Sequence, residues 1–169
     1  MARKTYEARG IAFAQRMSKH FKGCVTLRDF EEAIIEYNFT HKIPLVYAHG
    51  VSRIAIIRSD YVVKFNFKPT GWFDDGRAGD CESEQYVYEK ALRAGMEYLL
   101  AKTTVLHLNG LTCCVMPKVK GVGTCCWWER YCTAEEERWL KSNIYDLHSN
   151  NVGFYKKKVC VIDYAWNRG

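Results

Sequence analysis

The segment YDLHSNNVGF, residues 145–154, places an Asp and an Asn five positions apart, and the apolar run VCVIDYA, residues 159–165, follows with a second Asp. The apolar runs on either side of the lysine-rich turn between these segments predict a β-hairpin. That hairpin would return Asp163 to the side of the loop that carries Asp146 and Asn151. Phosphoryl transfer needs a carboxylate beside the acceptor hydroxyl and oxygen ligands for Mg²⁺. The pattern therefore favours Asp146 as the base, with Asn151 and Asp163 as metal ligands.

The strand-like run YVVKFNF, residues 61–67, carries one lysine among mostly apolar residues. Lys64 would be costly in the interior of a sheet unless an acidic residue paired with it. The segment ESEQYVYEKALRAG, residues 82–95, predicts a helix that ends at its glycine. This helix offers Glu84 as the first choice of partner and Glu82 as the second. The alternative is an edge-strand lysine whose ammonium group reaches solvent.

The rest of the chain predicts two helices followed by a β-rich part. Amphipathic spacing predicts a helix over residues 5–21, and Thr26 with Asp29 resembles a capping box that opens a second helix, which ends before Pro44. Asn109–Gly110, between TTVLHL and LTCCVM, is a strong hairpin signal. The sequence further predicts a strand at 53–57, a polar loop at 68–80 and a linker at 117–123. A capping box of Thr133 and Glu136 predicts a last helix, which runs to about Asn143.

In this order, the motifs resemble those of the protein-kinase-like superfamily over roughly residues 45–165. The family pattern is H-R-D-L-x-x-x-x-N, followed later by D-F-G. By that resemblance Asp146 stands at the catalytic Asp, Asn151 at the metal-binding Asn and Asp163 at the Asp of the second loop. The loop looks most like that of minimal phage-type serine/threonine protein kinases, which similarly reads D-x-H-S-x-N.

The sequence departs from the family pattern at several positions. Ile144 and Tyr145 replace the usual His and Arg, while Tyr164 and Ala165 replace the usual Phe and Gly. The missing Arg would hold a phosphorylated activation loop, so the resemblance implies no regulation of that kind. His148 has two interpretations: it shapes the loop by hydrogen bonding, or it contacts the transferring phosphoryl group.

The resemblance implies ATP and Mg²⁺ as cofactors, with Lys64 as the phosphate-binding lysine and Glu84 as its catalytically required partner. The glycine-rich pattern G-x-G-x-x-G is absent, and AHGVSRIAII offers a single glycine in its place. Backbone N–H groups in such a turn can still cover phosphates. The residues expected to contact ATP are Gly50, Ser52, Arg53, Lys64, His148 and, at the adenine edge, Met116 with Pro117.

Together these expectations describe an α+β protein with a truncated protein-kinase-like fold. It would have an N-lobe made of an antiparallel β-sheet and one key helix, then a reduced C-lobe, with two N-terminal helices ahead of both. The expected segments are 1–44 for the helices, 45–116 for the N-lobe and 117–169 for the C-lobe, in one compact unit. Only six residues follow Asp163, so we expect no activation segment and no peptide-substrate platform after it.

Three functions are compatible with these motifs. The favoured one is an ATP- and Mg²⁺-dependent phosphotransferase, a minimal serine/threonine protein kinase acting on itself or on a bacterial host protein. The second is a non-catalytic kinase-like binding protein that inhibits a host factor, and the third is a small-molecule phosphotransferase. The complete set of Lys64, Asp146, Asn151 and Asp163 argues against a pure binder. The missing acceptor lobe argues against the small-molecule enzyme.

Composition adds weaker expectations. A net charge of +6 over 169 residues is moderate, and we do not expect nucleic acid as a partner on that basis. No apolar run is long enough to span a membrane, so we expect a cytoplasmic protein, in the host cytoplasm if the chain is viral. The eight cysteines are expected to be reduced thiols, although a metal site of Cys125, Cys126 and Cys132 remains an alternative. Apolar surface near CCWWERY would favour a homodimer or a host partner.

Overall fold

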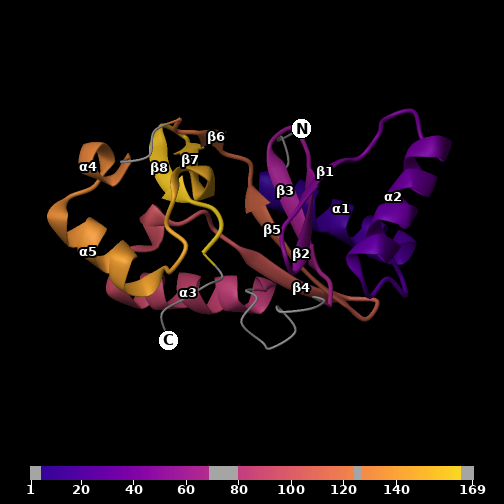
Figure 1. The fold of residues 1–169 in the computed structure, drawn as a ribbon, viewed down its shortest axis with the longest axis horizontal. Helices are drawn as coiled ribbons and strands as arrows, with labels where there is room; N and C mark the ends of the chain where they lie inside the picture. Colours follow the sequence, from indigo (N-terminus) through magenta and orange to yellow (C-terminus); the bar gives the residue numbers. More distant parts are fainter. Residues whose placement is uncertain (1–4, 69–79, 124–126, 165–169) are drawn as a thin grey trace.

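The computed structural model describes residues 5–68, 80–123 and 127–164, which form an α+β structure with two antiparallel sheets. Figure 1 shows a larger sheet toward one end of the molecule, with the N-terminal helices outside it, and a smaller sheet toward the other end. This confirms the α+β class predicted from the sequence. None of the described helices is both long and apolar enough to cross a membrane.

Two helices, α1 (Tyr6–His20) and α2 (Leu27–Thr40), precede the sheet. The predicted capping box opens α2: the Asp29 N–H donates to the Thr26 hydroxyl, and the Thr26 N–H donates to the Asp29 carboxylate. Each bond satisfies a backbone or side-chain group at a helix end that would otherwise lack a partner. Both helices contribute their apolar faces to a single hydrophobic core with the larger sheet.

The larger sheet has the strand order β1–β2–β3–β5–β4, and all neighbouring strands are antiparallel. Asn109 and Gly110 form the predicted two-residue turn between β4 and β5, with φ of 52° and 80°. Phe21, at the end of α1, packs edge to face on Phe30 of α2 and on Phe65 of β3, so the two helices cover one face of the sheet. The strands are β1 (Val46–His49), β2 (Arg53–Ile57), β3 (Tyr61–Asn66), β4 (Thr104–Leu108) and β5 (Leu111–Pro117).

Helix α3 (Cys81–Ala94) is inserted between β3 and β4 in the chain. The Asp80 side chain caps its first turn, and Gly95, with a left-handed φ of 69°, ends it as the sequence predicted. The short 3₁₀ helix η2 (Glu97–Leu99) then leads to β4. The buried face of α3 carries one carboxylate among apolar residues, in the order Cys81, Glu84, Val87 and Ala91.

The C-terminal part builds a second hydrophobic core around Trp127 and Tyr164, and Val87 and Ala91 of α3 belong to it, so this helix joins the two halves. The structure confirms the capping box of Thr133 and Glu136 and the hairpin that follows the motif loop. The small sheet has the order β6–β7–β8. Its elements and neighbours are β6 (Lys120–Gly121), α4 (Trp127–Tyr131), α5 (Ala134–Asn143), η3 (Ser149–Asn151), β7 (Val152–Tyr155) and β8 (Lys158–Val161).

Candidate active site

Lys64 and Glu84 face each other, as the sequence predicted. Lys64 points away from the core-facing Phe65 because successive side chains of a strand alternate between faces. Its Nζ lies 2.6 Å from Glu84 Oε1, and the Glu84 side chain is fully buried. Glu82, the second choice, is exposed and instead accepts a hydrogen bond of 2.9 Å from Asn66. The register of α3 on the sheet therefore selects Glu84.

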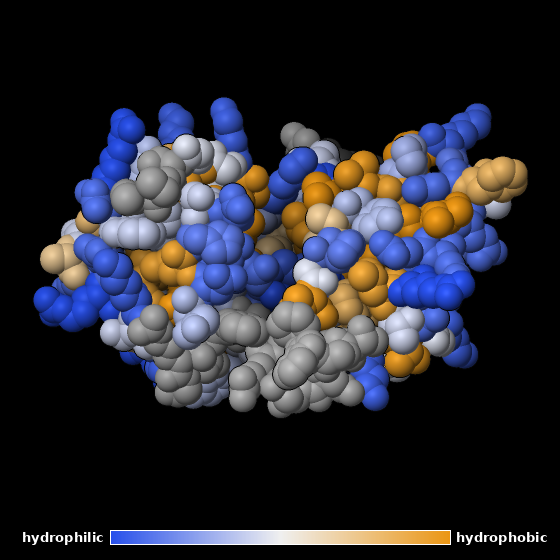
Figure 2. All heavy atoms as spheres, in the orientation of Figure 1, coloured by the Kyte–Doolittle hydropathy of each residue, from blue (hydrophilic) through white to orange (hydrophobic). Residues whose placement is uncertain are grey.

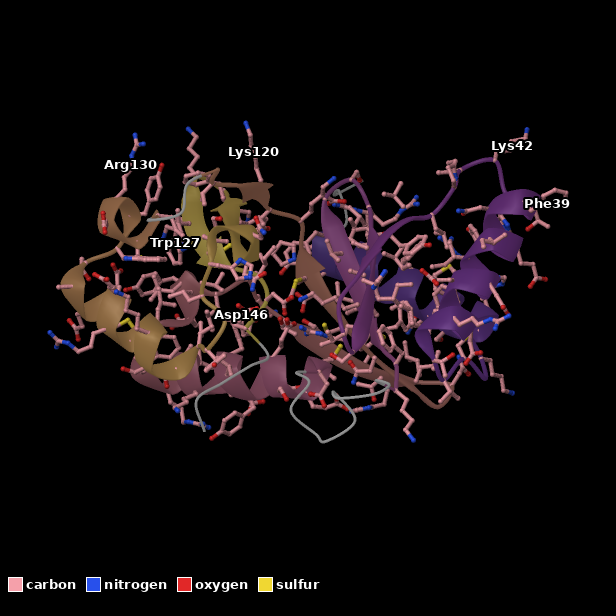
Figure 3. The ribbon with its side chains drawn as sticks, viewed as in Figure 1. Phe39, Lys42, Lys120, Trp127, Arg130 and Asp146 are labelled. Carbon is pink, nitrogen blue, oxygen red and sulfur yellow. The ribbon has the colours of Figure 1, made fainter. Side chains whose placement is uncertain are left out.

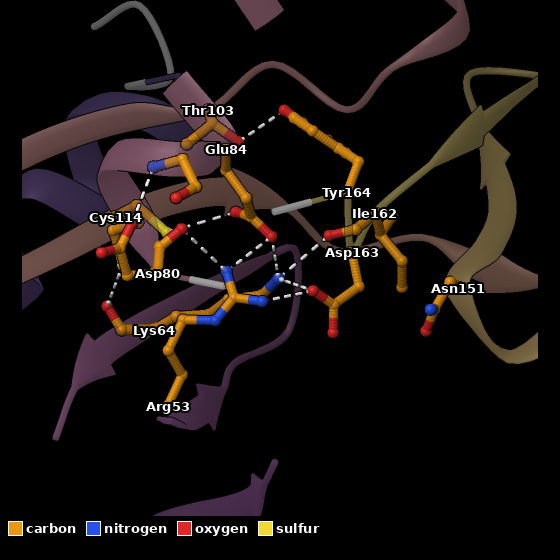
Figure 4. A network of polar contacts seen from close by, with 12 residues as sticks. Arg53, Lys64, Asp80, Glu84, Thr103, Cys114, Asn151, Ile162, Asp163 and Tyr164 are labelled. Atoms are coloured by element: carbon orange, nitrogen blue, oxygen red, sulfur yellow. Dashed lines mark hydrogen bonds and ion pairs between the residues drawn. The ribbon is translucent and has the colours of Figure 1, made fainter. Parts of the chain in front are cut away.

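Arg53 of β2 completes a buried charge cluster with this pair (Figure 4). One guanidinium nitrogen lies 2.7 Å from Glu84 Oε1, and the other forms an ion pair with Asp163 Oδ1. Lys64 Nζ lies 3.6 Å from the same Asp163 oxygen and donates a hydrogen bond of 3.0 Å to the Ile162 carbonyl. Two cations and two carboxylates thus neutralise one another where β2, β3, α3 and the end of β8 meet.

The pKa values of Arg53 and Asp163 are shifted toward their charged forms. Burial alone would lower the pKa of Arg53, but the carboxylates of Glu84 and Asp163 outweigh it and raise that pKa above its ordinary value. Burial likewise would raise the pKa of Asp163, but the charges of Lys64 and Arg53 outweigh it and hold the pKa below the usual range. Asp163 is therefore an anion at neutral pH, which its predicted role as a metal ligand requires.

Cys114 of β5 is a part of the site that the sequence did not indicate. Its thiol donates to Glu84 Oε2 over 3.6 Å, on the opposite side of the carboxylate from Lys64. Burial raises the pKa of the Cys114 thiol well above its usual value, so it stays protonated and remains a donor. Cys114 comes close to Glu84 because it is paired with Lys64 across the antiparallel strands β3 and β5. This pairing depends on the order of the strands in the sheet, which the spacing of residues in the sequence does not reveal.

The motif loop holds Asp146 through its own neighbours. The Asn151 amide nitrogen donates to the Asp146 carbonyl at 3.0 Å and lies 3.3 Å from Asp146 Oδ2. His148 Nδ1 accepts from the Asn150 N–H, so its Nε2 carries the hydrogen and faces Asp146 Oδ1 at 3.3 Å. These contacts favour His148 as a residue that shapes the loop. The Ile162 N–H donates to the Asn151 carbonyl at 2.8 Å, which fixes the loop against β8.

One cavity of about 440 Å³ brings most of the predicted site residues together. Figure 2 shows the surface hollowed between the two halves of the molecule, and Figure 3 places Asp146 there. Glu84, Asn151 and Met116 are buried, and His148 is exposed beside Asp146, so these four predicted residues do not line the cavity. His49, Val51 and the two alanines of β1 and β2 also line the cavity, although no sequence motif indicated them. The lining residues are Ala48, His49, Gly50, Val51, Ser52, Arg53, Ala55, Lys64, Asp146 and Asp163.

Asp163 and Asn151, the predicted magnesium ligands, each have a side-chain oxygen that their contacts within the protein do not use. The ion pairs of Asp163 with Arg53 and Lys64 both use Oδ1, and among the described residues no ion pair involves its Oδ2 (Figure 4). Asn151 uses its amide nitrogen toward Asp146, which leaves the amide oxygen available. Mg²⁺ is commonly held by one or two such ligands together with water and substrate phosphates.

Other metal chemistry has little support in the described parts of the chain. No group of three or more His, Cys, Asp or Glu side chains there is arranged to hold a metal ion. The alternative site of three cysteines rests on Cys125 and Cys126, which lie outside the described residues. Burial raises the pKa of the remaining candidate, Cys132, to about 11, so its thiol is protonated at neutral pH.

Comparison with known proteins adds no assignment: no protein-family model matches the chain, and no curated protein matches it.

Arg53→Gln is expected to raise the pKa of the Asp163 carboxyl toward its ordinary value, because one of the two cations that stabilise the carboxylate is removed. An NMR titration of the Asp163 carboxyl carbon measures the shift. Arg58→Gln is the matched control, since Arg58 stacks on Phe13 away from the cluster and should leave that pKa unchanged. An unaltered pKa in Arg53→Gln would show that the ion pair with Asp163 does not persist in solution.

Proposed function

We propose that this protein is an ATP- and Mg²⁺-dependent phosphotransferase, specifically a minimal serine/threonine protein kinase that acts on itself or on a bacterial host protein. The observation that carries the proposal is the convergence of Lys64, Asp146 and Asp163 on one cavity, from three distant parts of the chain. Its volume of about 440 Å³ lies within the range of roughly 300–1,000 Å³ that is usual for ligand pockets.

Each residue has a role that follows from its position. Lys64, held by Glu84, binds the phosphates of ATP, and the turn that contains Gly50 and Ser52 lies beside them. The Gly50 N–H is bonded to the Arg53 carbonyl at 2.9 Å, so Gly50 shapes this turn and does not donate a hydrogen bond to the phosphates. Asn151 and Asp163 hold Mg²⁺, which neutralises charge on the phosphates and fixes their position. Asp146 accepts the proton of the acceptor hydroxyl and orients that hydroxyl toward the phosphate.

A protein acceptor fits the exposure of the proposed base better than a small molecule does. The Asp146 side chain is 56% exposed at the mouth of the site, so a serine or threonine on another protein can reach it. A small-molecule acceptor would need further walls around Asp146 to be held in place. Among the described residues of the motif loop, Asp146 alone lines the cavity, so the loop supplies no such walls.

One observation favours a second candidate, a non-catalytic kinase-like binding protein that inhibits a host factor. The four charges of Arg53, Lys64, Glu84 and Asp163 are already satisfied by one another. Nucleotide phosphates would have to compete with these carboxylates for Arg53 and Lys64. A binder faces no such competition, and measured phosphate transfer distinguishes the two candidates.

The test combines nucleotide binding with phosphate transfer. At about 100 times the dissociation constant, ATP with Mg²⁺ should stabilise the fold by about 2.7 kcal/mol, which raises the melting temperature by about 5–10 °C for a chain of this size. Incubation with γ-labelled ATP, alone and with a bacterial lysate, should label the protein itself or one host protein. Asp163→Asn is the control for both measurements, and it should reduce the thermal shift and the labelling. The absence of a thermal shift at millimolar nucleotide would remove the proposal and its ATP site together.

A further inference from the structure

Five basic side chains gather on the small sheet and on α4. Lys120 of β6 pairs with Phe154 of β7, and Lys158 of β8 pairs with Tyr155 of β7. The Arg130 guanidinium lies 5.5 Å from the centre of the Tyr131 ring, and that ring packs edge to face on Phe154 at 5.2 Å, which brings α4 to the sheet face that Phe154 and Lys120 share. Lys158 lies opposite Tyr155 on the other face, and the turn of Lys156 and Lys157 forms the edge between the two faces. We call the five exposed residues the lysine surface: Lys120, Arg130, Lys156, Lys157 and Lys158.

The lysine surface lacks an acidic partner within the described parts of the molecule. Ion pairs elsewhere engage several exposed cations, such as Lys102 and Lys141, but none joins a residue of the lysine surface to a described carboxylate. Glu129 is the one acidic side chain of α4, and it is exposed. In Figure 3, Lys120 and Arg130 project from the same edge of the molecule, and Figure 2 shows hydrophilic side chains along that edge. Like charges gathered in this way repel one another and attract an anionic partner.

The turn of the β7–β8 hairpin indicates that these charges are not incidental. Lys156 and Lys157 both adopt left-handed backbone conformations, with φ of 48° and 67°. Side chains with a Cβ atom are unfavourable there, and Asn-Gly is the preferred pair for such a two-residue turn. The other two-residue hairpin of the same chain does use Asn109 and Gly110, with φ of 52° and 80°. The β7–β8 turn therefore keeps two lysines at a position where they disfavour folding.

We propose that the lysine surface docks an acidic segment of a partner protein. Lysine is a flexible point charge, which suits carboxylates spaced along a peptide. A single-stranded nucleic acid would need open aromatic faces for its bases to stack on. Here Arg130 lies over the Tyr131 ring, and Lys156 lies over the Tyr155 ring at 5.3 Å. The edge of Tyr131 meets Phe154 at an interplanar angle of 90°, so the aromatic rings are engaged within the protein.

Under the proposed function, the docked protein is the phosphate acceptor or the inhibited target. The docking itself does not depend on phosphate transfer, so its test uses binding alone. A failure of docking can thus be told from a failure of the kinase proposal.

The decisive variant is Lys156→Asn/Lys157→Gly, which gives the turn the residues of the other hairpin. The probe is a fluorescently labelled poly-glutamate peptide, and binding is measured by anisotropy at physiological ionic strength. The variant should bind the peptide about five- to tenfold more weakly, as expected for the loss of two exposed charge contacts. Its melting temperature should rise by about 2–4 °C, because the left-handed turn is relieved. If the lysines had a purely structural role, peptide affinity would not fall while the melting temperature rises.

Lys19→Gln/Lys22→Gln is the matched control, since it removes the same charge from exposed positions at the end of α1. Peptide binding that is unchanged in this control and weakened in the turn variant supports docking at the lysine surface. Equal weakening in both variants would reduce the effect to net charge and overturn the proposal, and so would unchanged binding in the turn variant. A third outcome is that a labelled oligothymidine binds more tightly than the peptide and loses that binding in the turn variant. This outcome would overturn the proposal and identify the partner as a nucleic acid.

Discussion

Asp146→Asn is expected to lower the rate of phosphate transfer about 10²–10⁴-fold while leaving ATP binding nearly unchanged, because general-base assistance typically contributes that factor. Asp146 lines the cavity, but it stands apart from the cluster of Arg53, Lys64, Glu84 and Asp163 that we expect to hold phosphates and metal. Asparagine preserves the size of the side chain. Its amide oxygen can still accept from its neighbours in the loop, whereas it cannot take the proton of an acceptor hydroxyl.

Two further variants separate the role of the base from that of its neighbours. Asp163→Asn should weaken Mg²⁺–ATP binding as well as transfer, since a metal ligand both positions and neutralises the phosphates. Lys64→Ala should lose phosphate positioning. Each rate is measured per folded molecule, with the folded fraction taken from a denaturation curve. If Asp146→Asn transfers phosphate at the wild-type rate per folded molecule, Asp146 only shapes the loop, and the kinase-like binder becomes the better account.

Glu84→Gln is expected to lower the free energy of unfolding by about 3–5 kcal/mol, as is usual when one partner of a buried ion pair is removed. The Glu84 side chain is fully buried, and a single oxygen lies 2.6 Å from Lys64 Nζ and 2.7 Å from Arg53. Glutamine keeps the shape but leaves two largely buried cations with Asp163 as their remaining carboxylate. The same change should loosen Lys64 and so reduce phosphate transfer, even in the fraction that stays folded.

Glu82→Gln is the matched control, because Glu82 lies on the exposed side of the same turn of α3 and contacts Asn66 rather than Lys64. Surface substitutions of this kind change stability by less than about 0.5 kcal/mol. Urea denaturation at neutral pH measures both variants. A cycle with Lys64→Met then tests whether the two side chains are coupled, since contacting residues show interaction energies of about 0.5–3 kcal/mol. A loss below about 1 kcal/mol in Glu84→Gln would be too small for a buried pair and would mean that the carboxylate is hydrated in solution.

Local patterns in the sequence were sufficient where the physical cause is itself local. The capping boxes at Thr26 and Thr133 form because each hydroxyl needs only a backbone N–H three residues later. Asn109–Gly110 forms a hairpin because these two residues tolerate left-handed backbone. The partner of Lys64 was also predictable, since a charge in an apolar strand requires compensation and the next helix supplies few carboxylates. The catalytic and metal-binding roles of Asp146, Asn151 and Asp163 remain predictions.

Long-range pairing decided the rest of the site. Arg53 joins Glu84 and Asp163 only because β2 lies beside β3 and the end of β8 reaches the same point. Cys114 reaches Glu84 only because β5, rather than β4, is the neighbour of β3. Met116 is buried in the same strand and does not line the cavity. The alternation of apolar residues specifies that a strand forms and which face is buried, but it does not specify the neighbouring strand, because that choice depends on how the whole core packs.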